Sequence, residues 1–158
     1  MSSKSRRLSI KLVVLGLVAI GAWISTNLTV ATTKSLEKRV FWQTSEIPTK
    51  TGQYGSFIYP SSDYLIKREV NGKVFTKRVG CFEGDYLNFV DGAFYCNGEY
   101  LAKPLVSDRL DDKLPVFRFN GIVPEDMAFM VGDHPYSGDS RYLGFVDINT
   151  VKRVIPLW

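Results

Sequence analysis

The pattern of apolar and polar positions divides the chain into an uncharged N-terminal stretch and a longer region of short alternating segments. Residues 12–33 carry no charged side chain, and the densest apolar run is Leu12–Ile24. A helix needs about 20 apolar residues to cross the roughly 30 Å hydrocarbon core of a bilayer. The pattern therefore predicts a membrane-spanning helix with Trp23 near one interface. A cleaved secretory signal is the alternative, because Thr29–Ala31 loosely resembles a small-residue cleavage site.

From Tyr54 onward, short apolar and β-branched segments alternate with turn residues, which is typical of antiparallel sheets. Asn71-Gly72 predicts a hairpin, and Asp91-Gly92 and Asn97-Gly98 predict a meander. We expect strands at 56–59, 64–70, 73–79, 86–90, 93–96, 99–102, 127–131, 142–146 and 151–155. The predicted fold class is mainly β, with a single N-terminal transmembrane helix followed by one antiparallel β domain.

The charge distribution predicts an orientation for the chain. The net charge is +4, and four basic residues between Lys4 and Lys11 have no acidic neighbour. By the positive-inside rule we expect residues 1–11 to form a cytoplasmic basic tail, 12–32 a transmembrane anchor in the bacterial inner membrane, and 33–158 a periplasmic β domain. Because the basic excess lies largely in the tail and no basic patch is interleaved with aromatic residues, we expect no nucleic-acid binding.

Lys77 lies in the apolar, β-branched stretch Val74–Val79, which reads as a strand. Two interpretations compete: Lys77 extends into solvent from an edge strand, or it is buried and neutral. The second interpretation requires its pKa to fall from about 10.4 to about 7–8, which desolvation can achieve. Such a lysine is a general base.

Ser45 lies in the loop Gln43–Thr49, just before Pro48. Taken alone, it reads as a turn residue. A serine nucleophile needs a base, and His134, the only histidine, makes a Ser/His/Asp triad possible, although we interpret it as a loop residue. Lys77 is the alternative base.

The segment 132–146 adds a third group of polar residues. Asp139 and Arg141 are candidates for an ion pair that fixes the loop, and the Ser137 hydroxyl can orient a neutral amine. Cys81 and Cys96 are either disulfide-bonded in an oxidising compartment or free buried thiols. Without a CxxC pair and with one histidine, we expect no metal and no cofactor.

Three separated segments together resemble the bacterial type I signal peptidases, the membrane-bound Ser/Lys endopeptidases. The segment 45–49, Ser-Glu-Ile-Pro-Thr, resembles the nucleophile box Ser-Met-x-Pro-Thr. Lys77-Arg78 with Gly84-Asp85 resembles the base box Lys-Arg-x-x-Gly-x-Pro-Gly-Asp, with Cys81 for the first glycine and Glu83 for the proline. The segments 132–133 and 137–146 resemble the final box, with Leu143 for tryptophan.

The resemblance implies Ser45 as nucleophile, Lys77 as general base and Ser137 as the hydroxyl that orients Lys77. It implies that Gly132, Asp133, Asp139 and Arg141 are structural supports. The backbone N–H of Ser45 would donate to the oxyanion. The family's helper, a hydroxyl residue two positions before the nucleophile, is replaced by Gln43, so the second oxyanion donor is either Gln43, Thr44 or neither.

The short chain and the pattern Pro48, Gly52, Tyr54 resemble the plasmid conjugative-transfer pilin peptidases. The expected function is therefore cleavage of the signal segment of an exported precursor, with a pilin precursor as the preferred substrate and cyclisation of the product left open. Expected partners are that precursor as an extended peptide, the lipid bilayer and the conjugative transfer machinery. We expect Phe41 and Trp42 either to lie in the core or to contact lipid headgroups, and Trp158 to lie toward lipid. The alternative is a non-catalytic, membrane-tethered β module of a secretion or pilus assembly.

Overall fold

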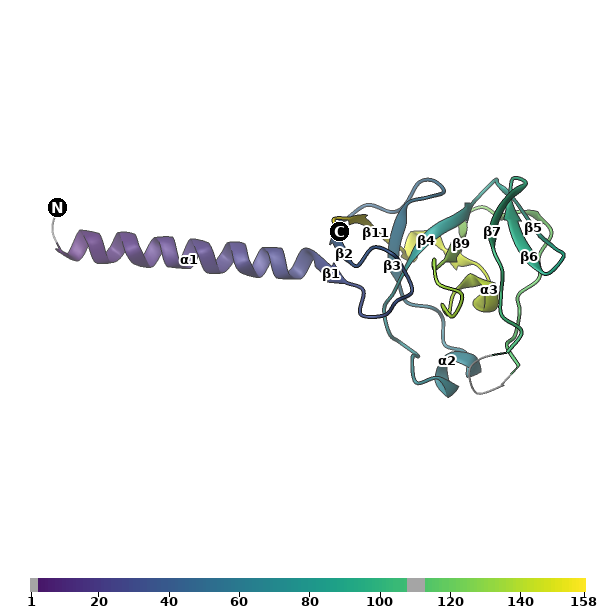
Figure 1. Ribbon diagram of the computed structural model, residues 1–158. Helices are drawn as coiled ribbons and strands as arrows, with labels where there is room; N and C mark the ends of the chain where they lie inside the picture. The colour runs from purple at the N-terminus through teal and green to yellow at the C-terminus, as the bar shows by residue number, and fades with distance from the viewer. Residues whose placement is uncertain (1–2, 108–112) are drawn as a thin grey trace.

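The computed structural model describes residues 3–107 and 113–158, with the side chains of its first helix from Ile10 onward. The expectation that Asp108, Asp111 and Asp112 form a solvated charged run lies outside the described residues. A long helix, α1 (Ser3–Asn27), projects from one end of a β domain (Figure 1). None of its apolar window Ile10–Asn27 is buried. Eighteen helical residues span about 27 Å, so the window is long enough to cross a bilayer.

The β domain contains two antiparallel sheets, and α1 leads directly into the larger one. The elements after α1 are β1 (Leu28–Val30), β2 (Val40–Gln43), β3 (Tyr54–Phe57), α2 (Asp63–Lys67), β4 (Phe75–Phe82), β5 (Tyr86–Val90), β6 (Ala93–Cys96), β7 (Glu99–Ala102), β8 (Gly121–Ile122), β9 (Met127–Val131), α3 (Ser140–Leu143), β10 (Val146–Asp147), a 3-10 turn (Ile148–Thr150) and β11 (Lys152–Pro156). The larger sheet has the order β1-β2-β11-β3-β4-β9-β10, and the smaller has the order β7-β6-β5-β8. The mainly β prediction is confirmed.

The predicted meander is confirmed because its turns contain residues that accept left-handed backbone. Asp91 and Gly92 have φ values of 51° and 75°, and Asn97 and Gly98 have 52° and 83°. Two consecutive positive φ values are the signature of the tight hairpin turn that matches strand twist. The segments 86–90, 93–96 and 99–102 are therefore β5, β6 and β7 as predicted.

Two predicted strands are wrong. The residues after Ser62 form α2, because the Ser62 side chain accepts a hydrogen bond from the backbone of Leu65 and caps a helical turn. The residues after Asp139 form α3, where the Asp139 carboxylate caps the turn in the same way. Within the expected anchor 12–32, the helix ends at Asn27, and Leu28–Val30 is a strand of the sheet.

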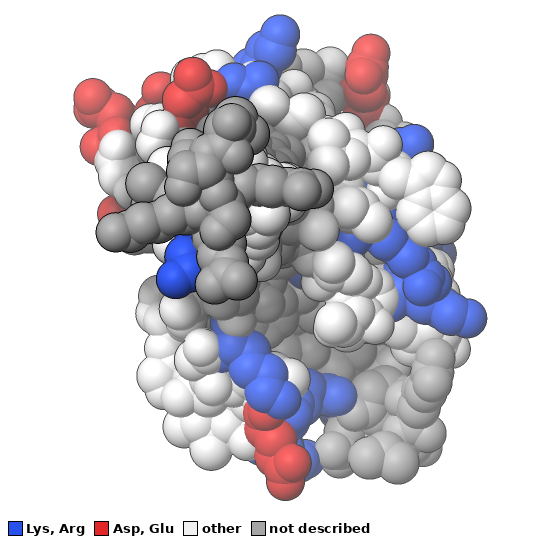
Figure 2. Space-filling view, turned by 90° about the vertical axis from the view of Figure 1, so that its left-hand side faces the viewer, with Lys and Arg blue, Asp and Glu red and all other residues white. Residues whose placement is uncertain are grey.

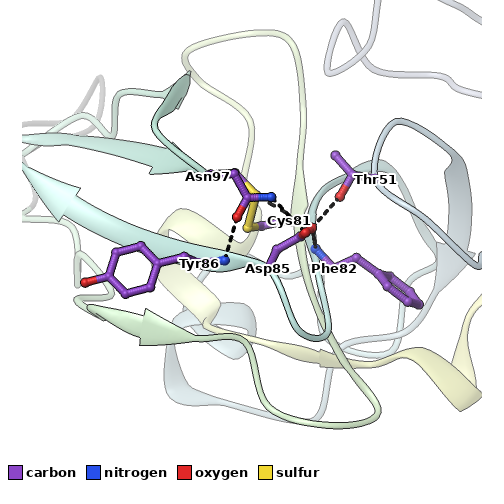
Figure 3. The surroundings of a disulfide bond; sticks show 7 residues. Thr51, Cys81, Phe82, Asp85, Tyr86 and Asn97 are labelled. Carbon is purple, nitrogen blue, oxygen red and sulfur yellow. Dashed lines mark hydrogen bonds between the residues drawn. A yellow bond between two sulfur atoms is a disulfide. The ribbon is translucent and has the colours of Figure 1, made fainter.

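A disulfide between Cys81 of β4 and Cys96 of β6 joins the two sheets (Figure 3). Of the two alternatives for Cys81 and Cys96, the structure therefore has the disulfide and not the free thiols. Beside it, the Asp85 carboxylate accepts hydrogen bonds from Thr51 Oγ1 and from Asn97 Nδ2, both at 2.9 Å. These bonds favour the ionised carboxylate, and the pKa of Asp85 is below its usual value although burial opposes the change. The end of β4 is thus fixed to the smaller sheet.

Candidate active site

Lys77 is buried in the middle of the larger sheet, with only 3% of its surface exposed. Lys77 lies opposite Gly55 of β3. On its other side, Arg78 pairs with Val131 of β9, so continuing this register by one residue places Gly132 opposite Lys77. The space above the two glycines is filled by other segments: a Cβ at Gly55 would meet the side chains of Val151 and Pro48, and a Cβ at Gly132 would meet Ser137 and Ser35. The interpretation of Lys77 as a solvated edge-strand residue is wrong.

Burial lowers the pKa of Lys77 from 10.5 to about 8. The buried surroundings penalise the charged ammonium, and the nearby Arg141 cation adds to the effect, while Asp139 and Asp133 oppose it. An amine with this pKa is partly neutral near pH 7–8 and can accept a proton. The pocket therefore gives Lys77 the property that a general base requires.

The loop between β9 and α3 is held beside Lys77 by a buried ion pair. Asp139 and Arg141 are both buried, and Arg141 Nη2 lies 2.7 Å from Asp139 Oδ2. Arg141 also donates to the carbonyl oxygens of His134 at 3.0 Å and Ser137 at 3.2 Å, and Asp139 accepts from the backbone N–H of Gly132 at 2.8 Å. Arg141 Nη1 also donates to the carbonyl oxygen of Lys103 at 3.2 Å, outside the loop. Because the other bonds of the pair are made to residues 132–139, the pair fixes the course of this loop.

Ser137 is also buried, and its Oγ has no hydrogen-bond partner within the part of the chain that the structure describes. Its side chain lies over Gly132: a Cβ added at Gly132 would collide with the Ser137 hydroxyl and would lie 2.7 Å from the carbonyl oxygen of Ser35. Gly132 thus lets two other segments approach β9. A buried hydroxyl without a partner is costly in a purely structural role.

The structure does not bring Ser45 to Lys77, which corrects the predicted pairing. Ser45 follows β2 and is exposed, and β11 and β3 lie between β2 and β4. The backbone N–H of Thr44 donates to the carbonyl oxygen of Arg153 in β11. Arg153 is opposite Gly55 of β3, and Gly55 is opposite Lys77 of β4. Three strand spacings, or roughly 14 Å of backbone, therefore separate this end of β2 from Lys77.

The other predicted residues of that loop are also away from Lys77. Gln43 pairs with Val154 inside the sheet, and Glu46 binds Arg153, with Nη1 and Oε2 at 2.7 Å. Neither Gln43 nor Ser45 is among the described residues that line the cavity beside Lys77. This loop accordingly has a structural role in connecting β2, β11 and β3.

Ser35, which the sequence analysis did not select, lies at the site instead. It is in the turn that joins β1 to β2, and its carbonyl oxygen accepts from the backbone N–H groups of Asp133 at 2.8 Å and His134 at 3.3 Å. The Asp133 carboxylate in turn accepts from the N–H of Glu37 at 3.1 Å. Ser35 Oγ lies 2.8 Å from Thr33 Oγ1. The turn is therefore fastened to the loop that carries Ser137.

A cavity of about 530 Å³ lies beside Lys77. Ser35 and Lys77 both line it, and Ser35 and Ser137 together line a smaller adjoining hollow of about 170 Å³. The larger cavity is bounded by residues 29–33, by Tyr64 and Leu65 of α2, and by residues 73–77. A hydroxyl and a partly neutral amine thus line one cavity, and a second hydroxyl lines the hollow beside it. These are the kinds of group that a Ser/Lys peptidase uses.

The comparisons with known proteins agree with this chemistry. Residues 8–157 match the family model described as signal peptidase, peptidase S26. The chain belongs to the signal peptidase S26 family. A crystal structure of a signal peptidase I from Enterococcus faecalis V583 is 27% identical, and the match covers 70% of this chain and 99% of that one, with a TM-score of 0.45. No curated protein matches the sequence.

Membership of the signal peptidase family makes the chain a serine peptidase of the signal-peptide-cleaving type, and it supports association with a membrane. The predicted family is confirmed.

Among the described residues, one group could offer ligands to a metal ion: Cys81, Asp85 and Cys96, whose ligand atoms lie within 4.8 Å of one another. Both sulfur atoms are in the disulfide and are not available as thiolates.

Proposed function

We propose that this signal peptidase is a membrane-anchored endopeptidase whose nucleophile is Ser35 and whose general base is Lys77. The observation that carries the proposal is that Ser35 and the buried, partly neutral Lys77 line one cavity. Ser35 Oγ attacks the scissile carbonyl, Lys77 takes its proton and returns it to the leaving amine, and water resolves the acyl-enzyme. Ser137 orients the Lys77 amine by offering its unpaired hydroxyl.

The assignment of Ser35 also removes a departure from the family pattern. The family's oxyanion helper is a hydroxyl residue two positions before the nucleophile, and Thr33 has this position relative to Ser35. The hydrogen bond between the two hydroxyls supports this arrangement. We therefore assign the oxyanion hole to the backbone N–H of Ser35 and the hydroxyl of Thr33.

The substrate is proposed to bind as an extended strand. β1 is the outer strand of its sheet, so its second edge is unpaired among the described residues. β4 pairs with β9 only from Arg78 onward, and Gly132 is the last residue opposite it, so the edge of β4 at residues 75–76 has no strand neighbour there. Both edges face the cavity, which is lined by Val30 and Thr76. A peptide between them can bond to both backbones. The periplasmic orientation of this site follows from the basic N-terminal tail.

A comparison of two serine variants tests the proposal. Full-length wild type, Ser35→Ala, Ser45→Ala and Lys77→Ala are reconstituted in proteoliposomes and incubated with candidate precursors. We expect cleavage by wild type and by Ser45→Ala, and none by the other two. Cleavage by Ser35→Ala together with inactive Ser45→Ala would return the nucleophile to Ser45. Full activity of Lys77→Ala would refute the Ser/Lys mechanism.

We propose a pilin precursor of conjugative transfer as the first substrate to test, on the resemblance of this short chain to pilin peptidases. Intact mass of the product distinguishes the two outcomes of acyl transfer: a linear product shows hydrolysis, and loss of one water relative to it shows cyclisation. Cleavage of general secretory precursors in preference to pilin would refute this substrate. Family membership favours the enzyme over the alternative of a non-catalytic module.

A further inference from the structure

The cavity beside Lys77 is lined by basic side chains and by no carboxylate among the described residues. Arg68, Lys73 and Lys77 line it, and its other described walls are apolar, aromatic, hydroxyl-bearing or glycine residues. A second cavity, of about 570 Å³, differs in this respect, because Glu37 and Asp133 line it together with basic residues. The cavity beside Lys77 therefore presents one sign of charge to a ligand that enters it.

The two carboxylates that influence the pKa of Lys77 are each paired with an arginine. Asp139 Oδ2 lies 2.7 Å from Arg141 Nη2, and Asp133 Oδ1 lies 3.5 Å from Arg78 Nε. None of these four residues lines the cavity, so their charges are balanced outside it. A cleft with one sign of charge and partly apolar walls concentrates the electrostatic field inside it.

Lys73 is the cation best placed to meet a substrate side chain. It closes the turn that follows α2: its N–H donates to the carbonyl oxygen of Val70 at 3.1 Å, and Gly72 has a φ of 72°. The Lys73 side chain is exposed, and no carboxylate among the residues that the structure describes lies in an ion pair with it. Lys73 therefore offers a cation to a ligand at the open side of the cavity.

Arg68 adds a second basic group on the same side. It is the C-cap residue of α2, and its guanidinium carbon lies 4.8 Å from the centroid of the Tyr64 ring, which also lines the cavity. Contact with an aromatic face restricts where a guanidinium can lie. Figure 2 shows Lys and Arg side chains on the lower part of the face around α1, at the height at which Figure 1 places α2. The end of α2 and the turn after it thus form a basic wall of the cavity.

The separation of Lys73 and Lys77 indicates which part of a bound substrate meets this wall. β4 begins at Phe75, and its edge at residues 75–76 has no strand neighbour among the described residues. An extended chain advances about 3.3 Å per residue, so Lys73 lies roughly 13 Å along the chain from Lys77. A substrate strand on this edge advances at the same rate, so the side chain near Lys73 belongs to a residue about four positions from the cleaved bond.

We propose that Lys73, with Arg68 beside it, selects substrates that carry an acidic side chain about four residues from the cleaved bond. This selection rests on the proposed function, because it requires the cleaved bond to lie at Ser35 and Lys77. A carboxylate is the anion that a polypeptide substrate offers to a lysine. Its ion pair is present in the bound substrate and in the transition state alike, so it lowers KM and leaves kcat unchanged.

An exchange of charge between enzyme and substrate tests the proposal. The probes are variants of the pilin precursor proposed above, each with Asp, Asn or Lys at one position three to five residues from the cleaved bond, on either side of it. Full-length wild type, Lys73→Glu and Lys50→Glu are reconstituted in phosphatidylcholine vesicles with and without phosphatidylglycerol, and kcat and KM are measured for each probe. Lys50 is the matched control, because it is exposed and does not line the cavity.

We expect wild type and Lys50→Glu to have a KM about 3- to 5-fold lower for the Asp probe than for the Asn probe at one of these positions, with equal kcat. Lys73→Glu should lose this preference and favour the Lys probe, a reversal that general damage to the fold would not produce. Because the ion pair is partly exposed, the preference of wild type should decrease at about 1 M salt.

Equal KM values of wild type for the Asp and Asn probes at every position would overturn the proposal and leave the proposed function intact. An Asp preference that Lys73→Glu retains would do the same. A defect of Lys73→Glu that is equal for all probes and appears only with phosphatidylglycerol would also overturn it, because Lys73 would then contact lipid headgroups. If wild type cleaves no probe, the proposed function fails, and the selection by Lys73 fails with it.

Discussion

Replacing Lys77 by methionine should stabilise the folded protein while abolishing its activity. Lys77 is buried, and its pKa falls from 10.5 to about 8 because burial penalises the ammonium. A change of this size corresponds to a cost of about 3 kcal/mol for keeping the protonated amine in the folded state. Methionine has a long, unbranched side chain and carries no charge. At pH 7, Lys77→Met should therefore raise the free energy of unfolding by up to about 3 kcal/mol.

The pH dependence of this difference identifies its cause. Below pH 8 the lysine is protonated in both the folded and the unfolded chain, so the full penalty applies. Between about pH 8 and 10.5 the unfolded chain binds more protons than the folded one, and the wild-type free energy of unfolding rises with pH. Above this window the amine is neutral in both states. The advantage of Lys77→Met should therefore be largest near neutral pH and decrease through this window.

Urea unfolding of the full chain in detergent micelles, followed by tryptophan fluorescence at about pH 7 and about pH 9.5, measures this difference. Lys73→Met is the matched control, because Lys73 precedes the same strand and is exposed. Its substitution should change the free energy of unfolding by less than about 0.5 kcal/mol. Equal stabilisation by both variants, or a Lys77→Met advantage that does not change with pH, would refute the burial argument.

Three further predictions concern the same site. The kcat/KM of the wild type should rise with pH through an apparent pKa of about 8, because only the neutral Lys77 amine accepts a proton; a flat profile across this range in a stopped-flow peptide assay would contradict it. Ser137→Ala should lower kcat by about 100-fold, because the Lys77 amine loses the hydroxyl that orients it. The melting temperature should stay unchanged or rise, because the Ser137 hydroxyl has no hydrogen-bond partner among the described residues. Asp139→Asn should lower the free energy of unfolding by about 3–5 kcal/mol, because it leaves Arg141 as a buried cation without its anionic partner. Urea titration measures this change, and a decrease in the free energy of unfolding below about 1 kcal/mol would contradict the prediction.

The parts of the fold that could be predicted are those governed by local chemistry. Asp91-Gly92 and Asn97-Gly98 determine tight turns by their own backbone preferences, so the meander around them could be placed from sequence. The apolar length of α1 could be recognised for the same reason. Local reasoning failed after Ser62 and Asp139, where a side-chain cap competes with an apolar pattern that also suits a strand. One capping hydrogen bond decided the conformation in each case.

The site could be predicted only in part. Lys77, Ser137, Asp139 and Arg141 lie in segments with a specific order of residue types. The fold buries all four, and it places Asp139 and Arg141 near enough to Lys77 to influence its pKa. The roles assigned to them remain proposals. Ser35 was overlooked because the residues after α1 read as a polar connector. The available signal was Thr33-x-Ser35, two hydroxyl residues two positions apart and directly after the membrane helix.

The choice between Ser45 and Ser35 depends on a strand at the far end of the chain. Neighbours in sequence usually pair in antiparallel sheets, and on that expectation β2 would lie beside β3, close enough for Ser45 to approach β4. Instead β11, formed by residues 152–156, inserts between β2 and β3 and moves Ser45 one strand farther from Lys77. The β1–β2 turn then brings Ser35 to the loop after β9, where Gly132 has no side chain to exclude it. The Thr33-x-Ser35 pattern favours Ser35 from local sequence, but the distance of each serine from Lys77 depends on the pairing of the whole sheet.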